Sequence, residues 1–273
     1  MSAVGPPQGA NCIRSGGSTA AKTASAGAPQ GDVDRGRRQL MRWGAAAVAG
    51  IAIAPGVRLF EIAAARVPGV PVSGRVRWGM LVDVNRCAPD CNECVTACNR
   101  ENHLGGGTRE TDSQWIRKIE FEDATGAKTR SLPMMCQHCA KPPCVDVCPT
   151  GASFRRADGI VLVDRHICIG CRYCMLACPY KARSFVHEAL HDQSPEVPRG
   201  KGTVEACTLC VHRVDRGRQP ACVEACAASG HEALIFGDLN DPQSEIARRI
   251  ASYATTQVRA DLRLDTGIRY QGL

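Results

Sequence analysis

The arrangement of cysteine constrains this chain more than any other feature. Sixteen of its 17 cysteines fall into four groups of four. Scattered pairs would suggest a disulfide framework, whereas tight groups of four indicate bound metal. With only 3 Trp, 4 Tyr and 5 Phe in 273 residues, something other than aromatic rings must fill the core. The groups are Cys87, Cys91, Cys94 and Cys98; Cys136, Cys139, Cys144 and Cys148; Cys168, Cys171, Cys174 and Cys178; and Cys207, Cys210, Cys222 and Cys226.

The four groups follow two alternating layouts. In the first and third groups, a Val-Asp pair (Val82-Asp83 and Val163-Asp164) stands at the same offset before the first cysteine, and three residues precede the last. In the second and fourth groups, a C-x2-C pair is followed by an insert of four or eleven residues and then by C-V-D-V-C or C-V-E-A-C. The chain is therefore an internally repeated unit.

Short strand-like and helix-like segments surround these groups. β-Branched and alternating residues predict strands at 78–84, 115–122, 159–164, 182–186 and 233–236. Single helical turns are expected at 95–102 and 175–177. The resulting order of strand, cysteine loop, short helix and strand predicts an α+β fold made of two intertwined modules of the bacterial ferredoxin type, with connecting insertions. We place this double domain at residues 66–240 and a helical or extended tail at 241–273.

The third group indicates which metal centre is bound. Residues 168–179 match the C-x2-C-x2-C-x3-C-P run of [4Fe-4S] ferredoxins, ending at Pro179. In that pattern three closely spaced thiolates bind one cluster, and the fourth cysteine binds the neighbouring cluster. We therefore expect ligands to cross between groups, and four [4Fe-4S] clusters whose iron is bound by all sixteen cysteines.

Chain distance suggests which groups exchange ligands. Only 20 positions separate Cys148 from Cys168, so the second and third groups are expected to pair, and the first pairs with the fourth. The predicted ligand sets are Cys87, Cys91, Cys94 and Cys226; Cys98, Cys207, Cys210 and Cys222; Cys136, Cys139, Cys144 and Cys178; and Cys148, Cys168, Cys171 and Cys174.

Two other classes of protein compete with an electron carrier. Paired C-x2-C elements also suit tetrahedral zinc, which would make the chain a zinc-scaffolded interaction module. A catalytic oxidoreductase is disfavoured, because the sequence has no nucleotide-binding glycine fingerprint, nucleophile–base arrangement or open three-ligand metal site. His138 and His166 stand beside complete sets of four thiols, so we expect them to be hydrogen-bonding neighbours or surface residues rather than ligands.

The N-terminal region predicts export. Residues 1–65 form a leader, whose first 35 residues lack the apolar content to fold. The segment 37–41, Arg-Arg-Gln-Leu-Met, precedes a short apolar stretch and resembles a twin-arginine signal, with a small-residue cleavage site at 63–65. The competing interpretation is a chance Arg pair before a buried helix. Cys12 lies in the leader and is expected to have no role.

Charge and hydropathy bear on the partners. Residues 1–66 hold 8 basic and 3 acidic residues of the chain's 34 and 27, so most of the net charge of +7 belongs to the leader. The remainder is too weakly basic for nucleic acid to be a partner. No apolar run reaches the roughly 18 to 20 uncharged residues that a membrane span needs. We expect a soluble, periplasmic body that a partner holds at the membrane.

The chain resembles the four-cluster ferredoxin subunits that accompany molybdopterin enzymes and NrfD-type membrane proteins, over residues 75–240. Within that group it is most similar to the DsrO-type subunits of DsrMKJOP complexes. The segments that carry the likeness are 136–154, 168–186, 199–205, 236–242 and 268–273. The resemblance implies an electron-transfer subunit in sulfur metabolism, with an NrfD-like integral membrane subunit, a multihaem cytochrome c and DsrMK-like subunits as partners. The alternative is the electron-transfer subunit of a molybdopterin-dependent reductase or dehydrogenase.

Two departures from the ferredoxin pattern leave every ligand in place. Three residues rather than two separate Cys87 from Cys91, and neither Cys98 nor Cys226 is followed by proline. The connections 187–201 and 211–221 are either docking surfaces for a partner or solvated loops.

Overall fold

The computed structural model describes residues 71–107, 109–122, 126, 129–191 and 193–273. The leader predicted at residues 1–65, with its twin-arginine segment, its cleavage site and Cys12, lies outside this part of the chain. Within the described residues, no helix combines the length and the apolar character needed to cross a bilayer.

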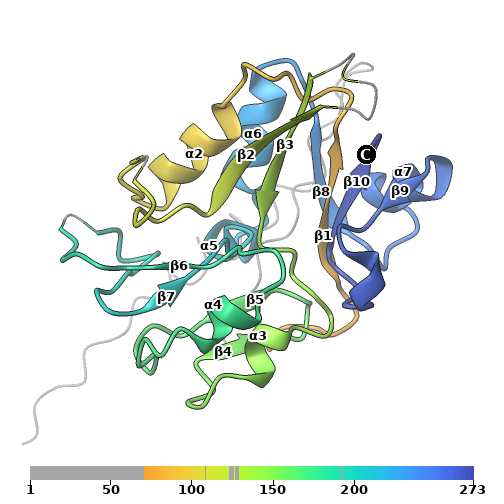
Figure 1. Cartoon of the computed structure of the whole chain (residues 1–273). Helices are drawn as coiled ribbons and strands as arrows, with labels where there is room; N and C mark the ends of the chain where they lie inside the picture. The colour runs from red at the N-terminus through yellow and green to blue at the C-terminus, as the bar shows by residue number, and fades with distance from the viewer. Residues whose placement is uncertain (1–70, 108, 123–125, 127–128, 192) are drawn as a thin grey trace, which may run out of the picture. The chain divides into compact units, whose positions relative to one another are not determined.

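A mixed four-stranded sheet forms one side of the molecule. Its strand order is β8 (Leu234–Asp238), β1 (Trp78–Asp83), β10 (Ile268–Gln271) and β9 (Thr255–Thr256). Strand β1 pairs antiparallel with β8 and parallel with β10, whose other edge pairs antiparallel with β9. In Figure 1, α7 (Glu245–Ser252) lies on one side of this sheet, and the segments that carry the cysteines lie on the other.

Side chains alternate along β1, so this strand contributes residues to the cores on both faces of the sheet. Met80 and Val82 join the main core, which also contains most of the buried cysteines. Leu81 points the opposite way and packs with Ile246 of α7 in a separate small core. Ser244 caps the N-terminus of α7, because its hydroxyl accepts a hydrogen bond from the backbone N–H of Ala247 at 3.2 Å.

Three antiparallel hairpins and several short helices complete the described fold. The hairpins are β2 (Ile116–Glu122) with β3 (Thr129–Met135), β4 (Ser153–Arg155) with β5 (Val161–Val163), and β6 (Ser184–Phe185) with β7 (Val204–Glu205). The helices are α2 (Glu93–Glu101), α3 (Pro143–Asp146), α4 (Tyr173–Ala177), α5 (Val211–Val214), α6 (Ala221–Ala228) and the 3-10 turn η2 (Ala260–Leu262). Helix α2 packs against α6, and α3 packs against α4.

This mixture of short helices and strands is the predicted α+β class. Each of the five expected strand regions contains a strand, although the strands differ from the expected bounds by one or two residues. Helix α2 runs for nine residues instead of the expected single turn, because Cys94, Ala97 and Cys98 give it a buried face. The segment 241–273, expected as a helical or extended tail, supplies α7, β9 and β10, and β10 hydrogen-bonds along β1 within the central sheet.

Candidate functional site

The sixteen cysteines outside the leader form no disulfides, and they line four cavities. Each cavity holds about 280 to 300 Å³ of space between protein atoms, part of it open to solvent. Each is lined by four cysteines that the crossed pattern assigns to one cluster. Site A has Cys87, Cys91, Cys94 and Cys226; site B has Cys98, Cys207, Cys210 and Cys222; site C has Cys136, Cys139, Cys144 and Cys178; and site D has Cys148, Cys168, Cys171 and Cys174.

Helical periodicity produces the crossing between groups. Residues four apart lie on the same face of a helix, one turn or about 5.4 Å along its axis. Two such cysteines therefore face the same side of the helix but reach neighbouring cavities. The crossing pairs are Cys94 and Cys98 on α2, Cys222 and Cys226 on α6, Cys144 and Cys148 at α3, and Cys174 and Cys178 at α4.

The four sites follow one another in the order A, B, C, D. Burial raises the pKa of the thiols of Cys222, Cys207 and Cys144, and a cysteine of the adjacent site raises each of these pKa values further. Such coupling requires that the two sulfurs be close. The pairs that join successive sites are Cys94 with Cys222 for A and B, Cys136 with Cys207 for B and C, and Cys174 with Cys144 for C and D.

Exposure differs between the ends and the middle of this line. All four cysteines of site B and all four of site C are buried. At the ends, Cys87 and Cys91 of site A are half-buried, and Cys171 of site D is exposed. Only the two terminal sites therefore present thiols near solvent.

A left-handed backbone residue shapes the first C-x2-C loop of the second, third and fourth cysteine groups. The residue just before the second cysteine has a positive φ in each of them: 44° at His138, 70° at Gly170 and 51° at Leu209. This conformation costs a non-glycine residue roughly 1–2 kcal/mol. At Gly170 the chain is also close to another backbone, because a Cβ there would lie 2.1 Å from the carbonyl oxygen of Gly202. At His138 and Leu209 the loops therefore hold a costly conformation where the thiols converge.

Lys118 stabilises the longer loop between Cys87 and Cys91. Its Nζ donates to the carbonyl oxygens of Ala88, at 2.7 Å, and of Cys91. The carbonyl oxygen of Pro89 lies 3.5 Å from the same nitrogen. Because Lys118 comes from β2, far along the chain, sequence spacing gave no indication of it.

The two histidines occupy different environments. His138 is buried, and its Nδ1 accepts a hydrogen bond from the backbone N–H of Val161 at 3.0 Å. Burial, with a contribution from nearby Arg183, lowers the pKa of His138 to about 3, so the ring is neutral. His166 is exposed, and its backbone N–H donates to Asp164. His138 thus ties its loop to β5, and His166 lies at the surface.

Backbone N–H groups donate to the cysteine sulfurs. Ser153 donates to Cys148 Sγ at 3.3 Å, and Ala233 donates to Cys226 Sγ at 3.2 Å. These two cysteines are the last of the second and fourth groups, and each donor lies at or beside the start of the following strand. Such donors favour the thiolate form.

Crowded, buried thiols suit a cationic metal centre. Burial and, after it, the neighbouring Cys87 raise the pKa of Cys94 to about 11. Burial and the neighbouring Cys144 raise the pKa of Cys139 to about 12. When a thiol binds a metal ion, the metal displaces the thiol proton and is bound by the thiolate.

Buried donors around the cavities point to the same chemistry. Asn102 donates from Nδ2 to Cys98 Sγ at 3.5 Å. Trp115 lines site B, and its buried Nε1–H has no hydrogen-bond partner among the described residues. Arg183 lines site C, and its Nε and Nη1 also have no hydrogen-bond partner among the described residues. Buried donors are nearly always satisfied, and the anionic sulfur of a bound cluster would satisfy these. The residues present therefore fit iron–sulfur clusters.

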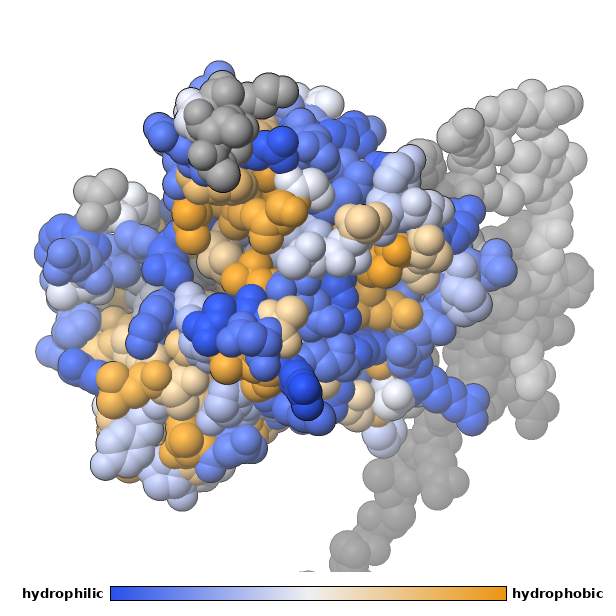
Figure 2. Space-filling view, turned by 45° about the vertical axis from the view of Figure 1, so that its right-hand side comes forward, coloured by the Kyte–Doolittle hydropathy of each residue, from blue (hydrophilic) through white to orange (hydrophobic). Residues whose placement is uncertain are grey.

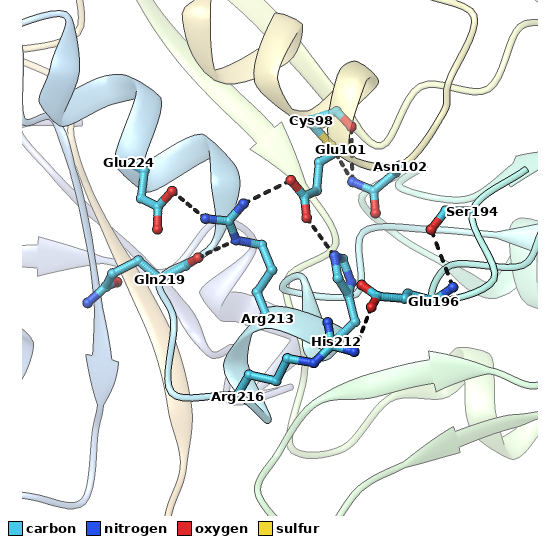
Figure 3. Close-up of polar contacts among 10 residues, drawn as sticks. All are labelled: Cys98, Glu101, Asn102, Ser194, Glu196, His212, Arg213, Arg216, Gln219 and Glu224. Carbon is cyan, nitrogen blue, oxygen red and sulfur yellow. Dashed lines mark hydrogen bonds and ion pairs between the residues drawn. The ribbon is translucent and has the colours of Figure 1, made fainter. Parts of the chain in front are cut away.

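A polar network lies beside site B (Figure 3). Glu101, the last residue of α2, lies 2.7 Å from His212 Nε2 and accepts from Arg213 Nη1 at 2.8 Å. Arg213 is buried and also pairs with Glu224 of α6. Because His212 and Arg213 belong to α5, these contacts hold the first part of the insert 211–221 against both α2 and α6.

These features together define a class of protein: a ferredoxin-type iron–sulfur protein of the α+β class. The comparison with a family of known domains agrees, because the 4Fe-4S dicluster domain matches residues 127–238. That match spans the second, third and fourth cysteine groups.

Relatives extend the likeness over most of the chain. The Hdr-like menaquinol oxidoreductase iron–sulfur subunit 1 of Archaeoglobus fulgidus is 44% identical over 225 residues, covering 72% of this chain and 84% of the relative. A tetrathionate reductase subunit of Salmonella typhimurium is 38% identical, with 79% of each chain covered. Protein NrfC of Escherichia coli K12 is 40% identical, with 68% of this chain and 77% of the relative covered.

The chain belongs to the family of 4Fe-4S ferredoxin-type iron–sulfur subunits. It binds 4Fe-4S clusters, and it is an electron-transfer subunit of an oxidoreductase complex rather than a catalytic one. Membership of this family sets aside the zinc-scaffold and catalytic alternatives.

Proposed function

We propose that this chain passes single electrons through four [4Fe-4S] clusters, between a quinone-reactive membrane subunit and a redox partner of a DsrMKJOP-like complex in sulfur metabolism. The observation that carries the proposal is the single line of four thiol-lined sites, with thiols near solvent only at sites A and D. A catalyst needs one reactive centre, whereas a conductor needs closely spaced centres that reach the surface at both ends.

The proposed ligands are the four cysteines that line each site. Sites A and B share helices α2 and α6, and sites C and D share α3 and α4. Each half therefore has the two-site organisation of a bacterial ferredoxin, which supports two intertwined modules. When bound, each cluster supplies a one-electron carrier. The protein holds it in place, keeps water from sites B and C, and sets its environment.

Site D offers a contact surface for one partner. Around the exposed Cys171, the side chains of Ile169 and Leu176 are 67% and 74% exposed, and Tyr173 is 59% exposed. Large apolar side chains grouped in this way mark interaction sites on soluble surfaces. Hydrophobic patches separated by hydrophilic ones are also visible on the face drawn in Figure 2. We assign the surface around Cys171 to a redox partner, and we expect the half-buried end at site A to serve the other.

The names of the relatives support the choice of partners. The Archaeoglobus relative is named as a subunit of a menaquinol oxidoreductase, which supports a quinone-reactive partner here. We assign that role to an NrfD-like integral membrane subunit, with a multihaem cytochrome c and DsrMK-like subunits as further partners. The predicted twin-arginine leader supports a periplasmic position, because that route exports proteins that are already folded around their cofactors.

A second candidate is the electron-transfer arm of a terminal reductase or dehydrogenase that contains molybdopterin. The likeness to the Salmonella tetrathionate reductase subunit, which covers 79% of this chain, favours it. The two candidates share the line of sites and differ only in the protein at its end.

The test is purification of the tagged protein, without oxygen, from gently solubilised membranes of its own host. Recovery of an NrfD-like protein, a multihaem cytochrome c and a DsrMK-like pair supports the first candidate, and recovery of a molybdopterin subunit supports the second. Recovery of neither would contradict both. Leu176→Ser should reduce recovery while leaving the iron content unchanged, whereas Tyr253→Ser, at an exposed position after α7, should not.

A further inference from the structure

Arg183 is a buried cation with no carboxylate partner among the described residues. It lies between Cys178 and strand β6 and is 6% exposed. Its Nη2 donates to Ser153 Oγ at 2.8 Å and lies 3.0 Å from Cys144 Sγ. Its Nε and Nη1 have no hydrogen-bond partner within the same part of the chain. The guanidinium therefore contacts sulfur but no anionic oxygen.

Other buried arginines of the fold are neutralised differently. Arg199 pairs with Glu205 at 2.7 Å, and Arg213 pairs with Glu101 at 2.8 Å. In each pair a carboxylate compensates for the loss of hydration that burial imposes on the guanidinium. Arg183 lacks such a carboxylate, so its compensating charge must come from the sites beside it.

The position of Arg183 lets it act on two sites. Its Nη2 contacts Cys144 of site C, and it also interacts electrostatically with Cys136 of site C and Cys174 of site D. The cysteines that act on it most strongly all belong to sites C and D. The cation thus stands where C and D adjoin.

We propose that Arg183 is a countercharge shared by the clusters of sites C and D, and that it raises the reduction potentials of both. This inference rests on the ligand sets of the proposed function. Reduction adds one electron at a site and so adds one negative charge next to the guanidinium. In a buried environment that charge interacts strongly with a cation a few ångströms away, which favours the reduced state. The electron comes from the neighbouring site or partner, no bond forms or breaks, and Arg183 keeps its proton throughout.

The experiment compares reduction potentials in the full chain purified with its clusters, measured by redox titration followed by electron paramagnetic resonance. Arg183→Met removes the charge, Arg183→Lys keeps it, and Arg109→Met removes an exposed arginine that pairs with Asp112. Cys139→Ser and Cys171→Ser identify the signals of sites C and D.

Arg183→Met should lower the reduction potentials of sites C and D by at least about 59 mV each. For a one-electron couple this is a tenfold decrease in the equilibrium constant for reduction. The reduction potentials of sites A and B should not change. Arg183→Lys should change the potentials of sites C and D by less, and Arg109→Met should leave all four potentials unchanged. If Arg183→Met kept four clusters with unchanged potentials, or if only one site shifted, this inference would be wrong and the ligand assignment of the proposed function would stand. If that variant loses clusters, the loss must fall on C and D, and loss at A or B contradicts the proposal. A wild-type protein with fewer than four clusters would overturn the ligand assignment and this inference together.

Discussion

Lys118 Nζ lies 2.7 Å from the carbonyl oxygen of Ala88, inside the loop that joins Cys87 to Cys91. The same ammonium group binds the carbonyl oxygen of Cys91. This loop is one residue longer than the C-x2-C loops of the other groups, and it has no residue of positive φ. A lysine from β2 therefore stabilises the longer loop by donating hydrogen bonds to its carbonyl oxygens.

Replacing Lys118 by Met should weaken site A selectively. The carbonyl oxygens would lose a charged donor, and hydrogen bonds to charged groups contribute roughly 1.5–3 kcal/mol each. We expect a lower thermal midpoint and faster loss of iron from site A than from the other sites, measured by chelator challenge and iron analysis. Lys118→Arg, which keeps the charge, is the control. Wild-type iron retention in Lys118→Met would show that the lysine does not support the loop.

Two serine substitutions one helical turn apart should affect different clusters. Cys94 and Cys98 both lie on α2, but they line sites A and B. Cys98→Ser should perturb the cluster that also uses the fourth cysteine group, and Cys94→Ser should perturb the cluster of the first group. Electron paramagnetic resonance of the reduced variants distinguishes the two. If both substitutions changed the same signal, the crossing of ligands would be wrong.

Gly170 and Gly151 form a matched pair for testing the third cysteine loop. Their φ angles are 70° and 69°, but an added Cβ would lie 2.1 Å from the Gly202 carbonyl oxygen at Gly170 and would meet nothing within 4 Å at Gly151. Gly151→Ala should cost only the left-handed conformation, roughly 1–2 kcal/mol. Gly170→Ala should cost more and should reduce cluster occupancy at site D. Equal thermal midpoints and equal iron contents in the two variants would refute the role of this close approach.

The parts of the site that were predicted from sequence depend on local spacing. A three-residue gap puts two cysteines on one face of a helix, and the shared offsets show which groups have the same layout. Each cavity brings together the four cysteines that the crossed pattern assigns to one cluster. Strands such as β1 were recognisable because their β-branched and apolar residues extend between turn residues.

The parts that were missed depend on contacts between distant segments. Nothing near Ile268 in the sequence indicates that β10 will lie parallel to β1, and nothing near Lys118 or Arg183 indicates the sulfur or carbonyl that each will face. The connection 187–201 reads as a charged, proline-rich loop. The side chain of Arg199 near its end is nevertheless buried and pairs with Glu205, whose exposed fraction is 0%.

The central claim is that sixteen cysteines hold four [4Fe-4S] clusters. Its most direct test is the iron, acid-labile sulfide and zinc content of the full chain purified without oxygen, together with integration of the reduced spectrum. We expect four iron and four sulfide for each of four clusters, or about sixteen of each per chain, with no stoichiometric zinc. Zinc bound without sulfide, or iron and sulfide sufficient for only two clusters, would contradict it.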